Sequence, residues 1–407
     1  MKKQLISLII LLSMLMAWSS CEDYATGVDP LIDRVEDERL NSESQVEFVI
    51  TGVKVQFGFT VDDLLQISDL LSDAMFFDAN LPGASYPTYA DIDVGEITFD
   101  NNSVDGPYNN VGELRFFADD LIRRVGEVDF LEESLKNEAL FWGNLFGGIA
   151  RYLYAAYFGL TQEQGGGIIS IDEPGPFIPS AEMYDLALEK YNAALSFAAD
   201  DYLKRVVNSL IARIHLFEGD YANAATFAQN GLVQGDEPFQ SLYNMENWNQ
   251  YYAQAGRGRW QCGADYRFHD YITADPNEAN RVLIEEVIGN DKTTVYYGQV
   301  KYPEQGSPIT FISWQENELM LAETEIRAGN NTGALTRINN VRASHGIDAL
   351  TAVDLDVLYQ ERDKELCFTG LRLIDQRRFN KWHLGAGTWK YFPITQSERN
   401  INPNIGP

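Results

Sequence analysis

Apolar residues recur every three or four positions along several long stretches of the chain, which is the spacing of one face of an α-helix. These stretches cover residues 46–77, 110–125, 131–159 and 180–199. In the third stretch, Phe141 and Ile149 belong to a broad apolar face, and Gly147-Gly148 permits a close crossing with another helix. The pattern predicts a mainly α-helical protein.

Two later segments, 203–232 and 316–342, share one internal pattern of a helix, a glycine turn and a second helix. The matching positions keep a constant offset: Ala212, Gly219 and Ala224 align with Ala322, Gly329 and Ala334. Small residues let two helices approach closely, and glycine supplies the turn. The spacing resembles the tetratricopeptide (TPR) unit, which buries its apolar face only by stacking. We therefore predict a TPR-like array of helix pairs within 110–235 and 311–382.

Two regions lack this periodicity and are predicted to form an irregular, loop-rich lobe. Residues 78–107 are rich in Asp, Asn, Gly, Pro and Tyr, and residues 234–308 are dense in aromatic residues. We expect one short strand, over 295–302. Asp91, Asp93 and Glu96 resemble part of a calcium loop but do not match its pattern, so no metal site is predicted.

The aromatic residues of this lobe are candidates for ligand binding. A sugar ring presents C–H groups on one face and hydroxyls at its edge, so it suits an aromatic platform beside amides and carboxylates. The alternative is that most of these rings close the core of the lobe. The candidate residues are Trp248, Tyr251, Tyr252, Trp260 and Tyr266, with a second wall at Tyr86 and Tyr89.

Composition narrows the class of function. The chain has 407 residues and a formal net charge of −29, which disfavours nucleic acid as a partner. It contains no HExxH, GxSxG or P-loop motif, and its four histidines are not at ligand spacing. No catalytic residue, cofactor or metal is predicted, and a glycosidase with two carboxylates is a less favoured alternative.

The N-terminus has the pattern of a targeting segment. Lys2 and Lys3 precede an apolar run over 5–18, which is shorter than the roughly 20 residues that span a bilayer. Small residues then lead to Cys21, as at a bacterial lipoprotein cleavage site. We predict a signal peptide over 1–20, lipidation of Cys21 and a polar tether over 21–45. The alternative is an ordinary secreted protein. Cys262 and Cys367 either pair or stay buried and free, and the second is favoured.

The stretch 358–382 carries the most informative motif. Charged residues sit between apolar positions, and Gly370 predicts either close packing or a break between two helical pieces. The motif residues are Glu361-Arg362, Glu365-Leu366, Gly370, Arg372, Asp375 and Arg378. They resemble the C-terminal signature of the SusD/RagB family, with Thr369 where that family usually has Glu. We expect these charges to hold the fold rather than to act in catalysis.

The tail strengthens the resemblance. Phe392-Pro393-Ile394-Thr395, Glu398 and Asn402-Pro403-Asn404 resemble the closing segment of SusD-like proteins, although Thr395 replaces a proline. Glu22-Asp23 resembles the acidic signal that directs Bacteroidetes lipoproteins to the cell surface.

The resemblance implies a single SusD-like domain over 46–407, with about four TPR-like helix pairs and a binding lobe over 78–107 and 234–308. It implies an outer-membrane lipoprotein, anchored through palmitate and facing the exterior, that captures nutrients. Its partners would be a TonB-dependent, SusC-like transporter and an oligosaccharide. Peptide capture, as in RagB-like members, is the alternative, and a purely structural adaptor is a further one.

Overall fold

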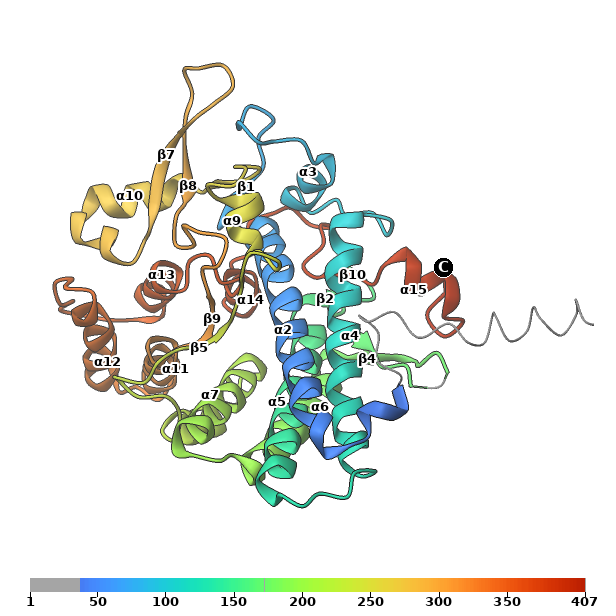
Figure 1. The fold of residues 1–407 in the computed structure, drawn as a ribbon. Coiled ribbons are helices and arrows are strands. Elements are labelled where there is room, and N and C mark those ends of the chain that lie inside the picture. Colours follow the sequence, from blue (N-terminus) through green and yellow to red (C-terminus); the bar gives the residue numbers. More distant parts are fainter. Residues whose placement is uncertain (1–36, 172, 407) are drawn as a thin grey trace, which may run out of the picture.

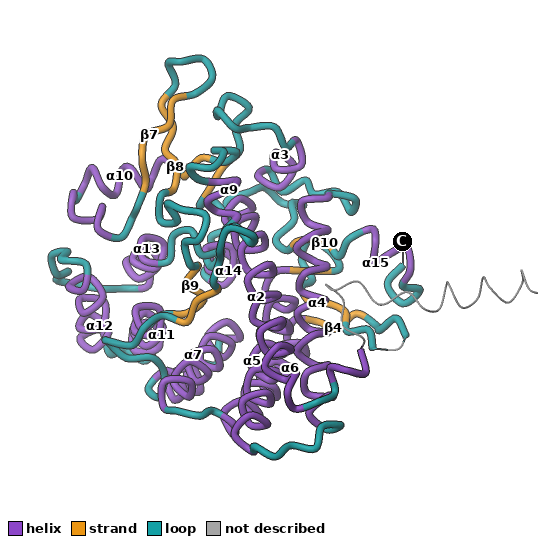
Figure 2. Tube along the Cα trace, in the orientation of Figure 1, coloured by secondary structure: helices purple, strands orange, loops and turns teal. Residues whose placement is uncertain are grey.

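Long α-helices frame the computed structural model, which describes residues 37–171 and 173–406 (Figure 1). Helices dominate the trace and short strands are confined to a few places (Figure 2). The predicted mainly α-helical class is confirmed. The predicted signal peptide, Cys21 and most of the tether lie outside the described residues. Within the described part of the chain, no helix is both long and apolar enough to cross a membrane.

The first half of the molecule is a layer of long helices. Its helices are α2 (Glu43–Leu71), α4 (Asn102–Val125), α5 (Glu133–Tyr157) and α6 (Ser180–Phe197). The α5–α6 crossing is close because Gly148 has no side chain: a Cβ there would lie 2.5 Å from the Tyr191 ring. Helix α4 is capped by Asn101, whose side chain accepts a hydrogen bond from the Ser103 N–H.

The folded chain begins earlier than the sequence predicted. A short 3₁₀ helix, η1 (Asp37–Leu40), and the start of α2 fall inside the predicted tether 21–45. Arg124 of α4 explains this difference, because its guanidinium pairs with Asp37 and donates to the Asn41 side chain over 2.7 Å. These contacts hold the segment before α2 against the helical layer.

The second half contains shorter helices stacked in pairs. They are α7 (Asp201–Glu218), α8 (Tyr221–Ala228), α11 (Trp314–Arg327), α12 (Asn331–Ser344), α13 (Leu355–Glu365) and α14 (Arg372–Arg378). The internal repeat predicted from the sequence is present: α7–α8 and α11–α12 turn at Gly219 and Gly329, which both have φ of 80°. Ala224 and Ala334 are fully buried where the second helix of each pair packs on the first.

The lobe has more regular structure than the sequence predicted. The region 78–107 contains a helix and the start of α4, and 234–308 contributes to a sheet of order β1-β6-β8-β7. Strand β8 lies within the predicted strand 295–302, and the β7–β8 hairpin projects from the top of the molecule in Figure 1. The elements are β1 (Met75–Phe76), α3 (Pro87–Asp93), β5 (Phe239–Ser241), α9 (Gln250–Ala255), β6 (Gly263–Ala264), α10 (Tyr266–Ala274), η2 (Pro276–Asn280), β7 (Ile284–Ile288), β8 (Val295–Gln299) and β9 (Ile309–Ile312).

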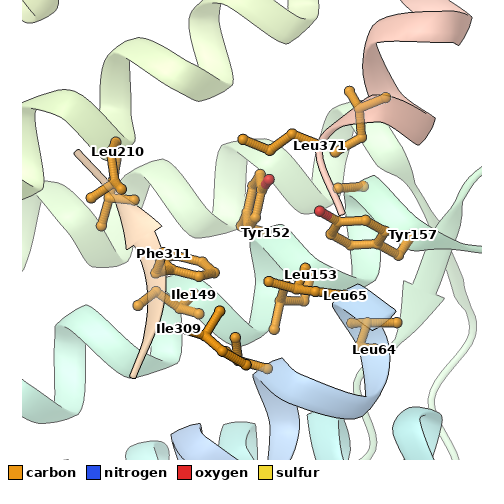
Figure 3. Close-up of a cluster of buried hydrophobic side chains, with 14 of the residues drawn as sticks. Leu64, Leu65, Ile149, Tyr152, Leu153, Tyr157, Leu210, Ile309, Phe311 and Leu371 are labelled. Atoms are coloured by element: carbon orange, nitrogen blue, oxygen red, sulfur yellow. The ribbon is translucent and has the colours of Figure 1, made fainter. Parts of the chain in front are cut away.

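One hydrophobic core joins the two halves. Figure 3 shows Leu65 of α2, Tyr152 of α5 and Phe311 of β9 in one cluster, with Leu210 of α7 and Leu371 beside them. The tail closes this core through a parallel pair, β2 (Phe158–Gly159) with β10 (Phe392–Pro393). The remaining elements are β3 (Gly166–Ile168), β4 (Phe177–Pro179) and α15 (Gln396–Ile401).

Gly370 meets both predictions made for it. It separates α13 from α14 with φ of 72°, and a Cβ there would lie 2.7 Å from a methyl group of Leu65. Its N–H donates to the buried Asp69 carboxylate over 3.1 Å. Cys262 and Cys367 are both buried and free, so the two thiols do not pair.

Candidate ligand-binding site

The charged residues of the C-terminal motif are buried or partly buried, and they pair with one another or with other elements. Arg362 donates to Asp375 over 2.8 Å, and Arg378 bridges Asp375 and Glu323 of α11. Burial opposes ionisation of Asp375, yet Arg362 and Arg378 hold the pKa of that carboxyl below its usual range. We call the group Glu323, Arg362, Asp375 and Arg378 the charge lattice.

Further motif residues extend these pairs to other elements. Glu361 accepts from Arg281 over 2.7 Å and from Arg342 of α12 over 2.8 Å. Arg372 donates to Asp73, at the end of α2, over 2.6 Å. The motif therefore ties α13 and α14 to the rest of the fold, as its structural interpretation predicts.

Among the predicted ligand-binding residues, Tyr251 lies in the core rather than at the surface. Its side chain is fully buried, its ring lies 4.8 Å from that of Tyr302, and its hydroxyl donates to Asp69 over 2.5 Å. Its position on the inner face of α9 explains the difference from the prediction. Tyr251 offers no surface to a ligand in this structure.

The other aromatic candidates of 234–308 are spread over the lobe. Trp248 is 43% exposed and its indole N–H donates to the Met245 carbonyl, while Tyr252 is half-buried on α9. Trp260 packs over Gly298 of β8, where a Cβ would lie 2.1 Å from the indole ring. Tyr266 is 45% exposed and stacks on Phe76 of β1 at 5.6 Å. Trp260 and Tyr266 thus both pack on the four-stranded sheet.

Tyr86 and Tyr89 instead line a cavity of about 440 Å³. The cavity lies where α2, α3, the start of α4 and α9 meet, so both predicted parts of the lobe contribute to it. Its lining combines aromatic rings with amides, hydroxyls and one carboxylate. The lining residues are Asp63, Ile67, Tyr86, Pro87, Thr88, Tyr89, Asn102, Ser103, Gly106, Pro107, Gln250 and Gln254.

The aromatic wall of this cavity is held from behind by hydrogen bonds. The rings of Tyr86 and Tyr89 meet edge to face at 5.4 Å. The buried Gln261 accepts from the Tyr86 N–H over 3.2 Å and donates to Gln254 over 2.7 Å. The Arg259 guanidinium lies 5.0 Å from the centre of the Tyr86 ring. A wall fixed in this way needs little ordering when a ligand binds.

Two adjacent carboxyls stand at the α2 side of the cavity. Asp62 is buried and accepts from the N–H groups of Asp63 and Gln250, over 2.8 and 3.2 Å. Burial, followed by the nearby Asp63, raises the pKa of Asp62. Asp63 lines the cavity, and burial raises the pKa of its carboxyl to about 6.

Sequence reasoning missed Asp63, Asn102, Ser103 and Gln254 as lining residues. The available signal was the pair Asp62-Asp63, two acids in the middle of an apolar helical stretch. Asn102 and Ser103 gave no such signal, because they stand in the stretch 78–107, which was predicted to be loop. Within residues 37–171 and 173–406, no group of three His, Cys, Asp or Glu side chains is arranged to hold a metal ion.

Comparison with known proteins agrees with the C-terminal motif. Residues 316–403 match the model of the SusD family. No curated protein matches the sequence.

Solved structures extend the similarity over most of the chain. A SusD superfamily protein from Bacteroides thetaiotaomicron has a TM-score of 0.73 at 18% identity, covering 89% of this chain and 98% of that one. A laminarin-binding SusD-like protein has a TM-score of 0.70 at 14% identity, covering 88% and 97%. Surface glycan-binding protein A from Bacteroides uniformis has a TM-score of 0.70 at 14% identity, covering 89% and 98%.

The resemblance predicted from the motif at 361–378 is therefore confirmed. The C-terminal region carries the SusD family sequence pattern, and the described chain has the SusD-like fold that goes with it.

Proposed function

We propose that the protein captures oligosaccharides at the cell surface and passes them to a TonB-dependent, SusC-like transporter. The observation that carries this proposal is the composition of the cavity beside Tyr86. A ring at the wall can stack on the C–H face of a sugar, while Gln250, Gln254 and Asp63 can bond its hydroxyls. One protein of the same fold is described as laminarin-binding and another as a surface glycan-binding protein, which supports the same class of ligand.

Binding without catalysis fits the lining. Glycoside hydrolysis ordinarily needs two carboxyl groups, one on each side of the scissile bond. Among the described residues that line the cavity, Asp63 is the one carboxylate. The neighbouring Asp62 does not line the cavity, and its carboxylate accepts hydrogen bonds from backbone N–H groups. We expect no product to appear when the protein is incubated with an oligosaccharide that it binds.

The test is binding of the lipid-free protein to a panel of soluble oligosaccharides and peptides by calorimetry. We expect Tyr86→Ala to weaken glycan binding about tenfold or more, because it removes the stacking ring. Tyr86→Phe, which keeps the ring, retains most of the affinity. Unfolding midpoints of all variants establish that the fold is unchanged.

Tyr266→Ala is the matched control, because Tyr266 is also partly exposed but packs on the sheet. If Tyr266→Ala abolished binding and Tyr86→Ala did not, the cavity would not be the binding site. The glycan would then bind on the part of the lobe that carries Trp248, Tyr252, Trp260 and Tyr266. Binding of peptides alone would favour peptide capture instead.

The anchor and the partner are tested in cells. Acylation of Cys21 after removal of residues 1–20 would place the protein on the outer membrane. We expect Cys21→Ala to abolish palmitate labelling and release the protein from the membrane fraction. Co-purification of a TonB-dependent transporter with the wild-type protein would support the transport role, and purification without one would argue against it.

A further inference from the structure

Asp63 differs from most buried carboxylates of this molecule in having no partner. Within the described residues, its side chain accepts no hydrogen bond and forms no ion pair. The side chain is partly buried and faces the cavity. An ionised carboxylate that has lost much of its hydration and has gained no hydrogen-bond donor lowers the stability of the folded state. The presence of Asp63 at this position therefore needs an explanation.

The charge of the cavity has one sign. Asp63 is the only charged residue in the lining within 37–171 and 173–406, and Asn102, Gln250 and Gln254 supply neutral amides from α4 and α9. On the α3 side, the titratable groups of the lining are the phenols of Tyr86 and Tyr89, and the Tyr89 hydroxyl donates to Gln66 over 3.0 Å. Behind Asp63 lies Asp62, a second acid. Among the residues that the structure describes, no basic side chain lines the cavity to balance Asp63.

Arg259 is the cation to consider as a counter-charge. Its guanidinium donates to Ser85 over 2.6 Å and to the Tyr86 hydroxyl over 3.3 Å, so its donors are directed to the edge of the aromatic wall. It forms no ion pair with Asp63, and it is exposed to solvent, where its charge is screened. Asp63 therefore dominates the electrostatics inside the cavity.

We propose that Asp63 selects the ligand by charge. The cavity takes a neutral or amine-bearing sugar unit, whose hydroxyl or ammonium groups donate to the Asp63 carboxylate, and it rejects uronic acid and sulfated units. This inference rests on the proposed glycan-binding function. A carboxylate offers two oxygens and accepts several hydrogen bonds, which matches neighbouring hydroxyls of a sugar. A second negative charge brought into the same partly desolvated space is repelled and has no donor to meet it.

The experiment uses oligosaccharides that differ only in charge. Cello-, malto- and laminari-oligosaccharides are each compared with their C6-oxidised carboxylate forms, and glucosamine oligomers supply an amine-bearing probe. Affinities are measured by calorimetry at pH 7.5 for the wild type, Asp63→Asn, Asp63→Glu and Asp91→Asn. Asp91→Asn is the matched control, because it removes one negative charge from α3 at a residue outside the lining.

We expect the wild type to bind a neutral or amine-bearing oligosaccharide about tenfold or more tightly than the corresponding C6-oxidised carboxylate form, and we call this the affinity ratio. In Asp63→Asn the ratio falls to within about twofold, while Asp63→Glu and Asp91→Asn keep it. Unfolding midpoints show whether each variant is folded. Asp63→Glu changes the side chain but keeps its negative charge, so it tests the role of charge even if Asp63→Asn does not fold.

The outcomes separate the two proposals. Equal or tighter binding of a carboxylate form, or an unchanged ratio in Asp63→Asn, overturns the selection by Asp63 and leaves glycan capture standing. Failure of the wild type to bind any oligosaccharide, or binding of basic peptides alone, overturns glycan capture and the inference with it.

Discussion

The charge lattice and the cavity both hold charged side chains away from water, but they treat them differently. In the lattice, Arg362 and Arg378 pair with Asp375 and Glu323 at 2.7–2.8 Å. In the cavity, Asp63 faces open space, and no donor from the described residues meets its carboxylate. A buried charge that is paired with an opposite charge serves the fold, whereas a partly buried charge left open to a cavity is available to a ligand.

Breaking the lattice has the largest expected effect. Arg362→Met leaves the buried Asp375 with only Arg378, and we expect a loss of about 3–5 kcal/mol in the free energy of unfolding. Urea unfolding followed by circular dichroism measures it. The double variant Arg362→Met, Asp375→Leu should recover part of the loss, because no uncompensated carboxylate remains.

An exposed ion pair is the control for that loss. Arg123 pairs with Asp120 but is 48% exposed, so Arg123→Met should cost less than about 1 kcal/mol. Equal costs for Arg123→Met and Arg362→Met would refute the claim that burial gives the lattice its importance.

Tyr251→Phe tests whether Tyr251 belongs to the core. It removes the hydroxyl that donates to Asp69, and we expect a loss of about 1.5–3 kcal/mol at pH 8. Burial raises the pKa of Asp69 to about 7, and the Tyr251 hydroxyl opposes that rise. The loss should therefore shrink as pH falls below 7 and Asp69 becomes protonated. A loss that did not vary between pH 5 and pH 8 would contradict this account.

Asp63→Asn should act in the opposite direction and stabilise the protein. The pKa of Asp63 is raised to about 6 by burial, so the folded state holds a proton that the unfolded state has released between about pH 4 and pH 6. Stability contributed by this group falls as pH rises through that window. We expect Asp63→Asn to gain about 1 kcal/mol at pH 7.5 and nothing at pH 4, measured by urea unfolding. A destabilised variant at pH 7.5 would show that Asp63 has a structural partner after all.

Trp248→Ala gives the smallest change in stability. The side chain is 43% exposed and its indole N–H donates to the carbonyl of Met245, so we expect a loss below about 0.5 kcal/mol. Thermal unfolding alongside Tyr251→Phe compares two aromatic residues three positions apart. A large loss for Trp248→Ala would place it in the core of the lobe.

Much of the fold could be read from the sequence because its signals are local. Gly219 and Gly329 mark equivalent turns, and helical periodicity predicts the long helices. The start of α2 was missed because it depends on Arg124, which lies far along the chain from Asp37 and Asn41. Contacts of this kind leave no local pattern.

The candidate site was only partly predictable. Tyr86 and Tyr89 were identified from composition, and they do line the cavity. Aromatic composition alone does not tell Tyr251, which points inward from α9, from Tyr252 beside it. Asp63 was overlooked because an acid within a helical stretch usually faces water, and only the packing of α3 and α9 around α2 encloses it.

The contact between Asp69 and Gly370 also constrains when the protein can fold. These residues lie 301 positions apart, and the parallel pair of β2 with β10 likewise joins the end of α5 to the tail. Helix α2 therefore lacks its final neighbours until residue Gly370 has been synthesised. Contacts between such distant residues form slowly, because the chain loses the conformational entropy of a long loop before the contact contributes any stabilisation. The nascent chain thus stays open at these contacts until Gly370 and β10 have been synthesised, so the closing step of folding comes late.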